Sequence, residues 1–429
     1  MNYYFIHKVI FRTLPILMIT NHVWASDVVN NTKNETHISD TTNRILTIPM
    51  AIYKAVAFSP QIKSTEYAVD ALNGTVQQAR YRPNPDVGFD VDNIAGRGVY
   101  QGIAAAEYNL NISQQIEMGN KRNARIAAAT ASVNTAKINI TTDKLDIKYA
   151  VEMLYLDILV ATEQVKLLRL QKQMARKTLD FISKRVDMAA EHETQRSKAN
   201  FIYKESLGNY TLAQQQLIYA KKKLAVICGY NHTNFDVSDD VFFHISPPSS
   251  LYYTGNIPNI PDLQKFDSIK KEKQAVLDLE KANAVPDPRI TAGIRHFSDS
   301  SDQALMLGVS IPIAIYNKNQ GNISRAYADI EQAEYNHKQA ELTTRQILID
   351  THQELNNAYT QLDDIKKTLL PEIQKSFSLA KTAYMNDILS YIEVLDAQTT
   401  LFETKQKYIQ ILKQYHAAKI KISRLTGTV

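Results

Sequence analysis

The segment SQQIEMGNK, Ser113–Lys121, returns 197 positions later as SIPIAIYNK, Ser310–Lys318, and Ile126 then returns as Ile323. Two shorter echoes flank this pair in the same order. PNPDV at 83–87 is matched by PDPRI at 286–290, and ICG at 227–229 by LTG at 425–427. Echoes in one order at similar spacing are typical of a duplicated unit. We therefore expect two structural repeats, 61–229 and 263–429, joined by a proline-rich connecting segment at 230–262.

Each repeat contains two stretches in which apolar residues alternate with polar or small ones. In the second copy, apolar side chains occupy every other position from Leu305 to Ile315. Alternation with a period of two predicts a strand with one apolar face. We expect two hairpins, with strands at about 86–92 and 106–118 in the first repeat and at about 289–297 and 304–316 in the second.

Very long helices are predicted after each hairpin. No proline or glycine occurs between Asn120 and Met188, and apolar residues such as Val151, Ile158 and Val165 recur every seven positions. Such rows are typical of coiled coils. About 65 helical residues would span roughly 100 Å. The sequence predicts helical hairpins at 120–228 and 319–427, the second kinked at Pro371.

The N-terminus has the pattern of a secretory signal. Lys8 and Arg12 precede a short apolar stretch, and Val23-Trp24-Ala25 supplies small or tolerated residues for cleavage before Ser26, so we expect a signal peptide at 1–25. The next segment, 26–60, is polar at first and receives no structural assignment.

Beyond the signal, no stretch is long and apolar enough for a transmembrane helix. A membrane location would therefore require a closed β-barrel. Four strands cannot close one, since single-chain bacterial barrels begin at eight. Two, three or four copies would supply 8, 12 or 16 strands, and the residues alone do not choose between them.

Several function classes find no support in the sequence. Removal of residues 1–25 would take away Lys8 and Arg12 and reduce the net charge from +5 to +3, and this near balance argues against nucleic acid, which would require a concentrated basic face. Cys228 is the only cysteine, and the histidines are scattered without ligand-type pairing. Neither Gly-x-Ser-x-Gly nor His-Glu-x-x-His occurs. We expect no enzyme, no cofactor and no bound metal.

Four segments carry a resemblance to a known family: NPDV at 84–87, SQQIEMGNKRNAR at 113–125, GVSIPIAIYNKNQGN at 308–322 and SYIEVLDAQTTLF at 390–402. They resemble the outer membrane factor family, the TolC-like efflux proteins, and within it the heavy-metal (cobalt-zinc-cadmium resistance) subgroup. The similarity covers about residues 60–429. It implies a mainly α-helical homotrimer with a twelve-stranded β-barrel and an α-helical barrel.

The resemblance also implies location and partners. The barrel would lie in the outer membrane of a Gram-negative bacterium, in contact with lipid, with the helices extending into the periplasm. A periplasmic adaptor (membrane fusion) protein and an inner-membrane RND-type pump would complete the assembly.

In the family, acidic residues near the hairpin tips narrow the periplasmic pore. Glu393 and Asp396 match these acidic positions in the second hairpin, and Gln195 occupies the corresponding position in the first. Three residues apart, Glu393 and Asp396 would share one helix face. Repeated by symmetry they would form an acidic ring, a selectivity device of cation pores. The alternative is an ordinary solvated helix face.

The tips themselves depart from the family pattern. The usual tip glycine is replaced by Ala189 in the first copy and by Asp387 in the second. Asn386 and Asp387 tolerate left-handed turns, so we expect the second turn to persist and the adaptor-docking surface to differ.

These observations favour a passive outer-membrane duct of an efflux pump for heavy-metal cations. The first alternative is the same fold in drug efflux or type I protein secretion. The second is a periplasmic coiled-coil scaffold that forms no barrel.

Overall fold

The computed structural model describes residues 44–239, 242–248 and 260–427. The expected signal peptide, residues 26–43 and part of the connecting segment lie outside these ranges. The helices are α1 (Ile48–Phe58), α2 (Pro60–Ala79), α3 (Lys121–Asp187), α4 (Glu193–Ile227), α5 (Pro261–Asn283), α6 (Gln320–Asp364), α7 (Leu370–Met385) and α8 (Tyr391–Thr426). The strands are β1 (Arg44–Leu46), β2 (Asp86–Asp92), β3 (Glu107–Gln115), β4 (Phe235–Val237), β5 (Arg289–Phe297) and β6 (Gln303–Ser310). Among the described residues, no helix combines the length and apolar character that a membrane span requires.

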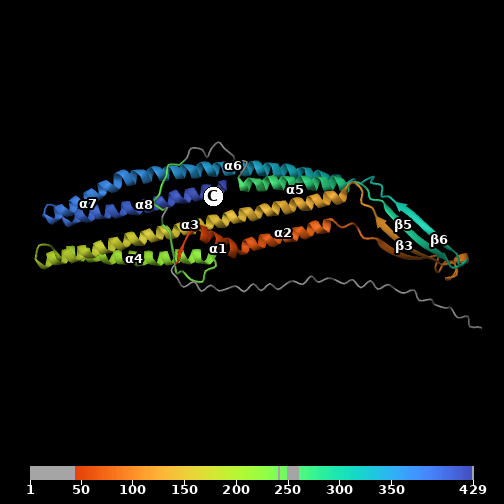
Figure 1. The fold of residues 1–429 in the computed structure, drawn as a ribbon, viewed down its shortest axis with the longest axis horizontal. Helices are drawn as coiled ribbons and strands as arrows, with labels where there is room; N and C mark the ends of the chain where they lie inside the picture. Colours follow the sequence, from red (N-terminus) through yellow and green to blue (C-terminus); the bar gives the residue numbers. More distant parts are fainter. Residues whose placement is uncertain (1–43, 240–241, 249–259, 428–429) are drawn as a thin grey trace, which may run out of the picture. The chain divides into compact units, whose positions relative to one another are not determined.

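One antiparallel sheet joins the two repeats in the order β2-β3-β5-β6 (Figure 1). Each repeat contributes a hairpin, and β3 of the first copy pairs with β5 of the second along nine residue pairs. This leaves β2 and β6 as the two edges, each with one partner strand in the sheet. The fold therefore has a TolC-like arrangement of four strands and long helices.

Two strands are shorter than the alternation predicted. The strand expected at 304–316 ends at Ser310, and the one expected at 106–118 ends at Gln115. Ser310 is paired with Arg289, the first residue of β5, so β5 offers no further residue for the positions beyond Ser310. In β3, one further backbone bond runs from the Ile116 N–H to the Pro288 carbonyl before the chain leaves the sheet.

The helices keep the order of the strands. Near the sheet, α2 packs on α3, α3 on α5, and α5 on α6. Farther from it, α4 packs on α3, while α8 packs on α3, α6 and α7 (Figure 1). Val151 and Ile158, from one predicted seven-residue row, are fully buried in the largest core. The coiled-coil spacing thus places one face of α3 against its neighbours.

The two long helices that follow the sheet begin in the same way. Asn120 and Asn319 precede α3 and α6 with φ of 61° and 59°, and each side-chain oxygen accepts a 2.7 Å bond from an asparagine amide three residues later. Asn120 therefore corresponds to Asn319, an offset of 199 rather than 197. The expected match of Ile126 with Ile323 is wrong by two residues, because the chain between strand and helix is longer in the second copy.

The sequence interpretation left three helices unassigned. Helices α2 and α5 precede the sheet in the two copies, and each ends shortly before a Pro-x-Pro, which cannot continue a helix. Helix α1 follows β1 within the unassigned segment and ends at Phe58. The next residue, Ser59, caps the start of α2, since its side chain accepts a bond from the Ile62 N–H at 3.3 Å.

Strand β4 of the connecting segment forms a short parallel pair with β1, which precedes α1. Tyr155 of α3 lies beneath it and is only 2% exposed. Its hydroxyl donates to the Leu46 carbonyl and accepts from the Ser238 N–H, both at 2.8 Å.

Pro371 perturbs its helix in the expected place. A π-helical turn, Ile365–Leu369, separates α6 from α7, and the Leu370 N–H donates to the Ile365 carbonyl. Proline supplies no N–H, and the wider turn absorbs the disruption without ending the helix.

Candidate functional site

The four-stranded sheet carries its apolar side chains on the face that nothing covers. Leu305 and Leu307 of β6 are 85% and 86% exposed, and Val87 of β2 is 72% exposed. The register places three polar residues, Gln114, His296 and Gln303, on this face as well. Its apolar residues are Val87, Phe89, Val91, Tyr108, Leu110, Ile112, Ile290, Ala292, Ile294, Leu305, Leu307 and Val309. A continuous exposed apolar surface of this kind marks contact with a membrane or another protein.

The opposite face is polar and hydrogen-bonded. Asn109, only 4% exposed, donates to Asp92 at 2.6 Å and accepts from Arg295 at 2.8 Å. Arg295 also pairs with Glu107 at 3.0 Å. A second arginine, Arg289 of β5, donates to Ser113 on the adjacent strand β3 and to Asp86 on β2, one strand farther.

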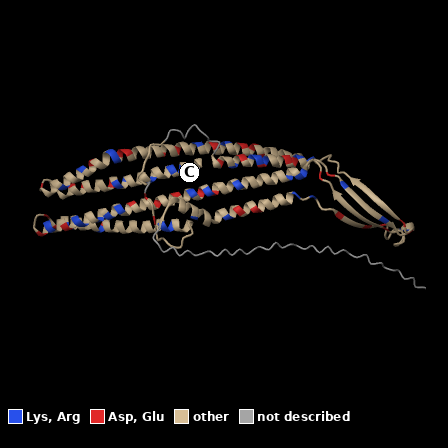
Figure 2. Ribbon diagram, in the orientation of Figure 1, with Lys and Arg blue, Asp and Glu red and all other residues tan. Residues whose placement is uncertain are grey.

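This distribution is the reverse of a water-soluble sheet, where the apolar face is buried and the polar face is solvated. It is the pattern of a membrane β-barrel wall, with an apolar outside and a polar interior. Figure 2 shows charges of both signs along the helices, whereas the strands are mostly uncharged.

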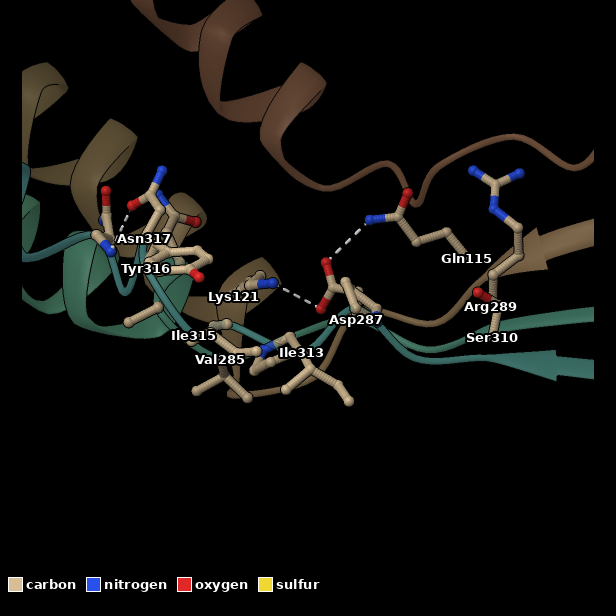
Figure 3. A pocket seen from close by; sticks show the side chains of 16 residues that line it. Gln115, Lys121, Val285, Asp287, Arg289, Ser310, Ile313, Ile315, Tyr316 and Asn317 are labelled. Carbon is tan, nitrogen blue, oxygen red and sulfur yellow. Dashed lines mark hydrogen bonds and ion pairs between the residues drawn. The ribbon is translucent and has the colours of Figure 1, made fainter.

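A polar junction joins the sheet to the helices at the mouth of a hollow of about 870 Å³. Figure 3 shows Asp287 between Lys121 and Gln115. The Lys121 ammonium lies 2.6 Å from the Asp287 carboxylate, and both side chains are 11% exposed. Gln115 and the Met118 N–H also donate to Asp287, at 2.9 and 2.8 Å.

These contacts control the ionisation of Asp287. Burial alone would raise its pKa, but the bonds from Lys121, Met118 and Gln115 outweigh burial and hold the pKa below its ordinary value. Gly119 permits the close approach, since it has φ of 65° and a Cβ there would lie 2.6 Å from Val285.

At the far ends of the hairpins, the tip residues singled out from the sequence adopt left-handed conformations. Ala189 and Asp387, which stand where the family has glycine, both have φ of 56°. Asn386 precedes the left-handed position at φ of −98° and closes α7 through backbone bonds.

Side chains that the sequence interpretation missed connect the two tips. Arg185 of α3 donates to Asp387 at 2.7 Å, and its guanidinium lies 5.4 Å from the Tyr384 ring centre. The Tyr384 hydroxyl donates to Glu191 at 3.0 Å. Burial and this bond to a carboxylate raise the pKa of Tyr384 to about 12. No repeated motif contains these residues, so pattern alone could not select them.

The three candidate aperture residues have different surroundings. Glu393 accepts bonds from the Ser390 N–H and hydroxyl at 2.8 and 3.0 Å and forms a capping box at the start of α8. Asp396 is exposed on the next turn, and its carboxylate has no hydrogen bond or ion pair to the described residues. Gln195 is half-buried in the first turn of α4. No group of three or more His, Cys, Asp or Glu in the described residues is arranged to hold a metal ion.

Known proteins resemble this chain over both of its repeats. The pattern of the family described as outer membrane efflux protein matches residues 51–229 and 259–428. The chain is 26% identical to the cobalt-zinc-cadmium resistance protein CzcC of Cupriavidus metallidurans, covering 89% of this chain and 90% of that protein. It is 21% identical to the nickel and cobalt resistance protein CnrC of the same organism, covering 67% and 68%.

Among solved structures, the chain superposes on CusC, described for its transmembrane channel formation. The TM-score is 0.71 at 16% identity, covering 88% of this chain and 91% of that one.

The assignment of the two sheet faces can be tested with neighbouring positions of β6. Leu307→Arg places a charge on the apolar face, which should destabilise the inserted sheet by about 2–4 kcal/mol and reduce the folded fraction in outer-membrane extracts. Met306→Arg is the matched control because its side chain lies on the polar face. Heat-modifiable gel mobility measures the folded fraction, and equal losses for the two variants would contradict the assignment.

The junction should make the protein acid-sensitive through Asp287. Because the folded pKa lies below the unfolded value of about 3.9, its stabilisation is complete above about pH 4 and is lost as pH falls through the folded pKa. Asp287→Asn should lower the unfolding temperature at pH 7 and flatten its decline below pH 4. Thermal unfolding of the detergent-solubilised protein between pH 2.5 and 7 measures both effects, and an unchanged acid limb in the variant would argue against this role.

Proposed function

Because the chain belongs to the outer membrane efflux protein family, we propose that it forms the exit duct through which heavy-metal cations leave the cell envelope. The family consists of efflux channel proteins rather than enzymes, and the chain is an outer-membrane channel component. Beyond this, we propose its cargo, its number of subunits, its partner proteins and the roles of its tip residues.

The observation that carries the proposal is the sheet with an exposed apolar face and a hydrogen-bonded polar face. In hydrocarbon, every backbone N–H and C=O must be bonded within the protein. The outer edges of β2 and β6 would violate this requirement in an isolated subunit. Three copies placed edge to edge would give the twelve-stranded barrel and would satisfy every edge.

The helices favour the same arrangement. On the β6 side, α6 carries exposed apolar residues at seven-residue steps, Tyr335, Leu342 and Ile349. On the β2 side, the exposed residues Leu212, Tyr219 and Val226 of α4 have the same spacing. Each outer helix therefore has a second coiled-coil seam besides the one used within the subunit. Homotrimer formation would cover both seams and continue the barrel as a helical cylinder.

Metal cations are the favoured cargo because two relatives of the chain are metal-resistance proteins. CzcC and CnrC are named for resistance to cobalt, zinc, cadmium and nickel. A duct needs no metal-binding site for this role, since an inner-membrane RND-type pump would supply the energy and the choice of substrate. A periplasmic adaptor would link the pump to the tips, with Ala189, Asn386 and Asp387 at the docking surface.

A deletion strain tests the cargo. Loss of the gene should increase growth inhibition by cobalt, zinc, cadmium or nickel, and plasmid-borne protein should restore tolerance. Growth on dyes and detergents, and secretion of type I substrates, serve as parallel measurements. Sensitivity to those agents with unchanged metal tolerance would favour the drug-efflux or secretion alternative.

The proposed acidic aperture requires a test that separates charge from helix capping. Glu393→Gln with Asp396→Asn removes both charges, while glutamine can still complete the capping box. In planar bilayers this variant should show higher single-channel conductance and weaker block by divalent cations, because an acidic ring would both narrow the pore and bind cations.

Ser390→Ala is the matched control, since it disrupts the cap and keeps both carboxylates. If this control reproduces the conductance change, the effect belongs to the fold of the tip and not to its charge. Wild-type conductance and block in the charge-free variant would remove Glu393 and Asp396 from the aperture.

A further inference from the structure

We propose that β6 pairs with β2 of a neighbouring copy in one defined register, with Val309 opposite Phe89 of that copy. The inference rests on the proposed shared barrel and specifies how its subunits join. It comes from the internal repeat, because within the chain β3 of the first repeat already pairs with β5 of the second, and we call this strand pairing the internal seam.

The two hairpins of the sheet are aligned residue for residue. Asp86 pairs with Ser113 in the first hairpin, and Arg289 pairs with Ser310 in the second. Strand β5 therefore corresponds to β2 at an offset of 203, and β6 to β3 at an offset of 197. All seven pairs of the first hairpin have counterparts in the second under these two offsets.

The internal seam is the pairing of β3 with β5, where Ile112 lies opposite Ala292. Applying the two offsets moves this pair to Val309 and Phe89. The same operation on the other members of the seam gives three further counterparts across the subunit boundary: Leu307 with Val91, Ile311 with Val87, and the Ile313 N–H with the Pro85 carbonyl.

The side chains agree with this register. Val309, Leu307 and Ile311 would meet Phe89, Val91 and Val87, which all belong to the apolar face. A shift by one residue would place apolar side chains opposite polar ones and turn one strand inside out, so only shifts by two or more remain as competitors.

The register also accounts for the unpaired end of β6. Ile311, Ile313 and Ile315 continue the alternation beyond the strand and are 61%, 82% and 66% exposed. Figure 3 shows Ile313 and Ile315 beside the junction hollow. In the proposed seam, Ile311 lies next to β2 of the neighbour and Ile313 lies next to the residues that precede β2. Strand β6 would therefore lengthen on assembly toward the bounds 304–316 predicted from the sequence.

Barrel geometry gives an independent check. Passing once across four strands in this register advances the pairing by four residues along β2. With about 3.3 Å per residue and about 4.8 Å between strands, the strands would tilt by about 35°. Barrel strands tilt by roughly 35–45°. An advance of only two residues per subunit gives a tilt of about 20°, which lies outside the range observed for barrels. An advance of six residues gives about 46°, which barrel geometry tolerates, but this register would differ from the internal pairing of β3 with β5.

Disulfide cross-linking tests the register in the full-length protein. Cys228→Ala removes the native thiol, and Val309→Cys with Phe89→Cys then forms the in-register pair. Val309→Cys with Val87→Cys, and Val309→Cys with Val91→Cys, are matched controls on the same face, displaced by two residues. Within one subunit positions 309 and 89 lie on opposite edges, three strand spacings or about 14 Å apart, so any bond must join two copies.

After mild oxidation in outer membranes, the in-register pair should give at least about fivefold more cross-linked product on non-reducing gels than either control, because the displaced pairs exceed the distance a disulfide can bridge. A displaced pair that links better overturns the register. Light scattering of the detergent-solubilised Cys228→Ala protein gives its oligomeric state and separates the remaining outcomes. An oligomer in which no cysteine pair forms a cross-link overturns the register but not the proposed duct. A folded monomer overturns the proposed duct as well.

Discussion

The structure depends on one constraint, the need of backbone N–H and C=O groups to be hydrogen-bonded wherever water is excluded. Strands β3 and β5 meet it completely because each has a partner on both sides. Strands β2 and β6 meet it on one side. A sheet that exposes leucine and valine and buries asparagine cannot remain an isolated sheet in water either, because its apolar face would associate. Both solvents therefore require the edges to find partners, and the closed barrel is the arrangement that serves a membrane.

The duplicated unit explains why helices and strands obey the same order. Each unit supplies a helix before the sheet, a hairpin in it and a long helix after it, so α2, α3, α5 and α6 follow the order of β2, β3, β5 and β6. Neighbouring strands are about 4.8 Å apart, whereas packed helices need 8–10 Å. Four strands and four long helices can share one circumference only if the strands tilt strongly and the helices enclose a wider tube. The polar junction around Asp287 lies where the sheet meets these helices.

Much of this architecture was predictable from local pattern. The alternation at 305–315 separates the two faces of a strand, although its apolar face is exposed here. The seven-residue row through Val151 and Ile158 identifies the buried face of α3. The end of β6 was not predictable from pattern, because alternation indicates that a stretch can pair but not where its partner strand begins, and β5 begins only at Arg289, opposite Ser310. The same limit applies to the site. Glu393 could be selected by motif, but its bonds to Ser390 depend on the turn that precedes α8, and the contact of Arg185 with Asp387 joins residues 202 positions apart. Lys121 and Asp287 did lie within the repeated motifs, where their opposite charges offered a signal.

The junction within the chain can be compared with its proposed counterpart between two copies. Inside the chain, Asp287 and Lys121 form an ion pair shielded from solvent. At the proposed boundary between copies, the offset of 203 places Asn84 at the position of Asp287, and the helix offset of 199 places Gln320 at the position of Lys121. A partly buried ion pair gains stability only when both partners are held in place, and removing one partner leaves a charge that is costly to shield. Covalent linkage guarantees the partner within a chain, whereas a subunit that has not yet assembled lacks it. Neutral amides at these two positions need no charged partner before assembly, and in the proposed seam they could exchange hydrogen bonds with a neighbouring copy.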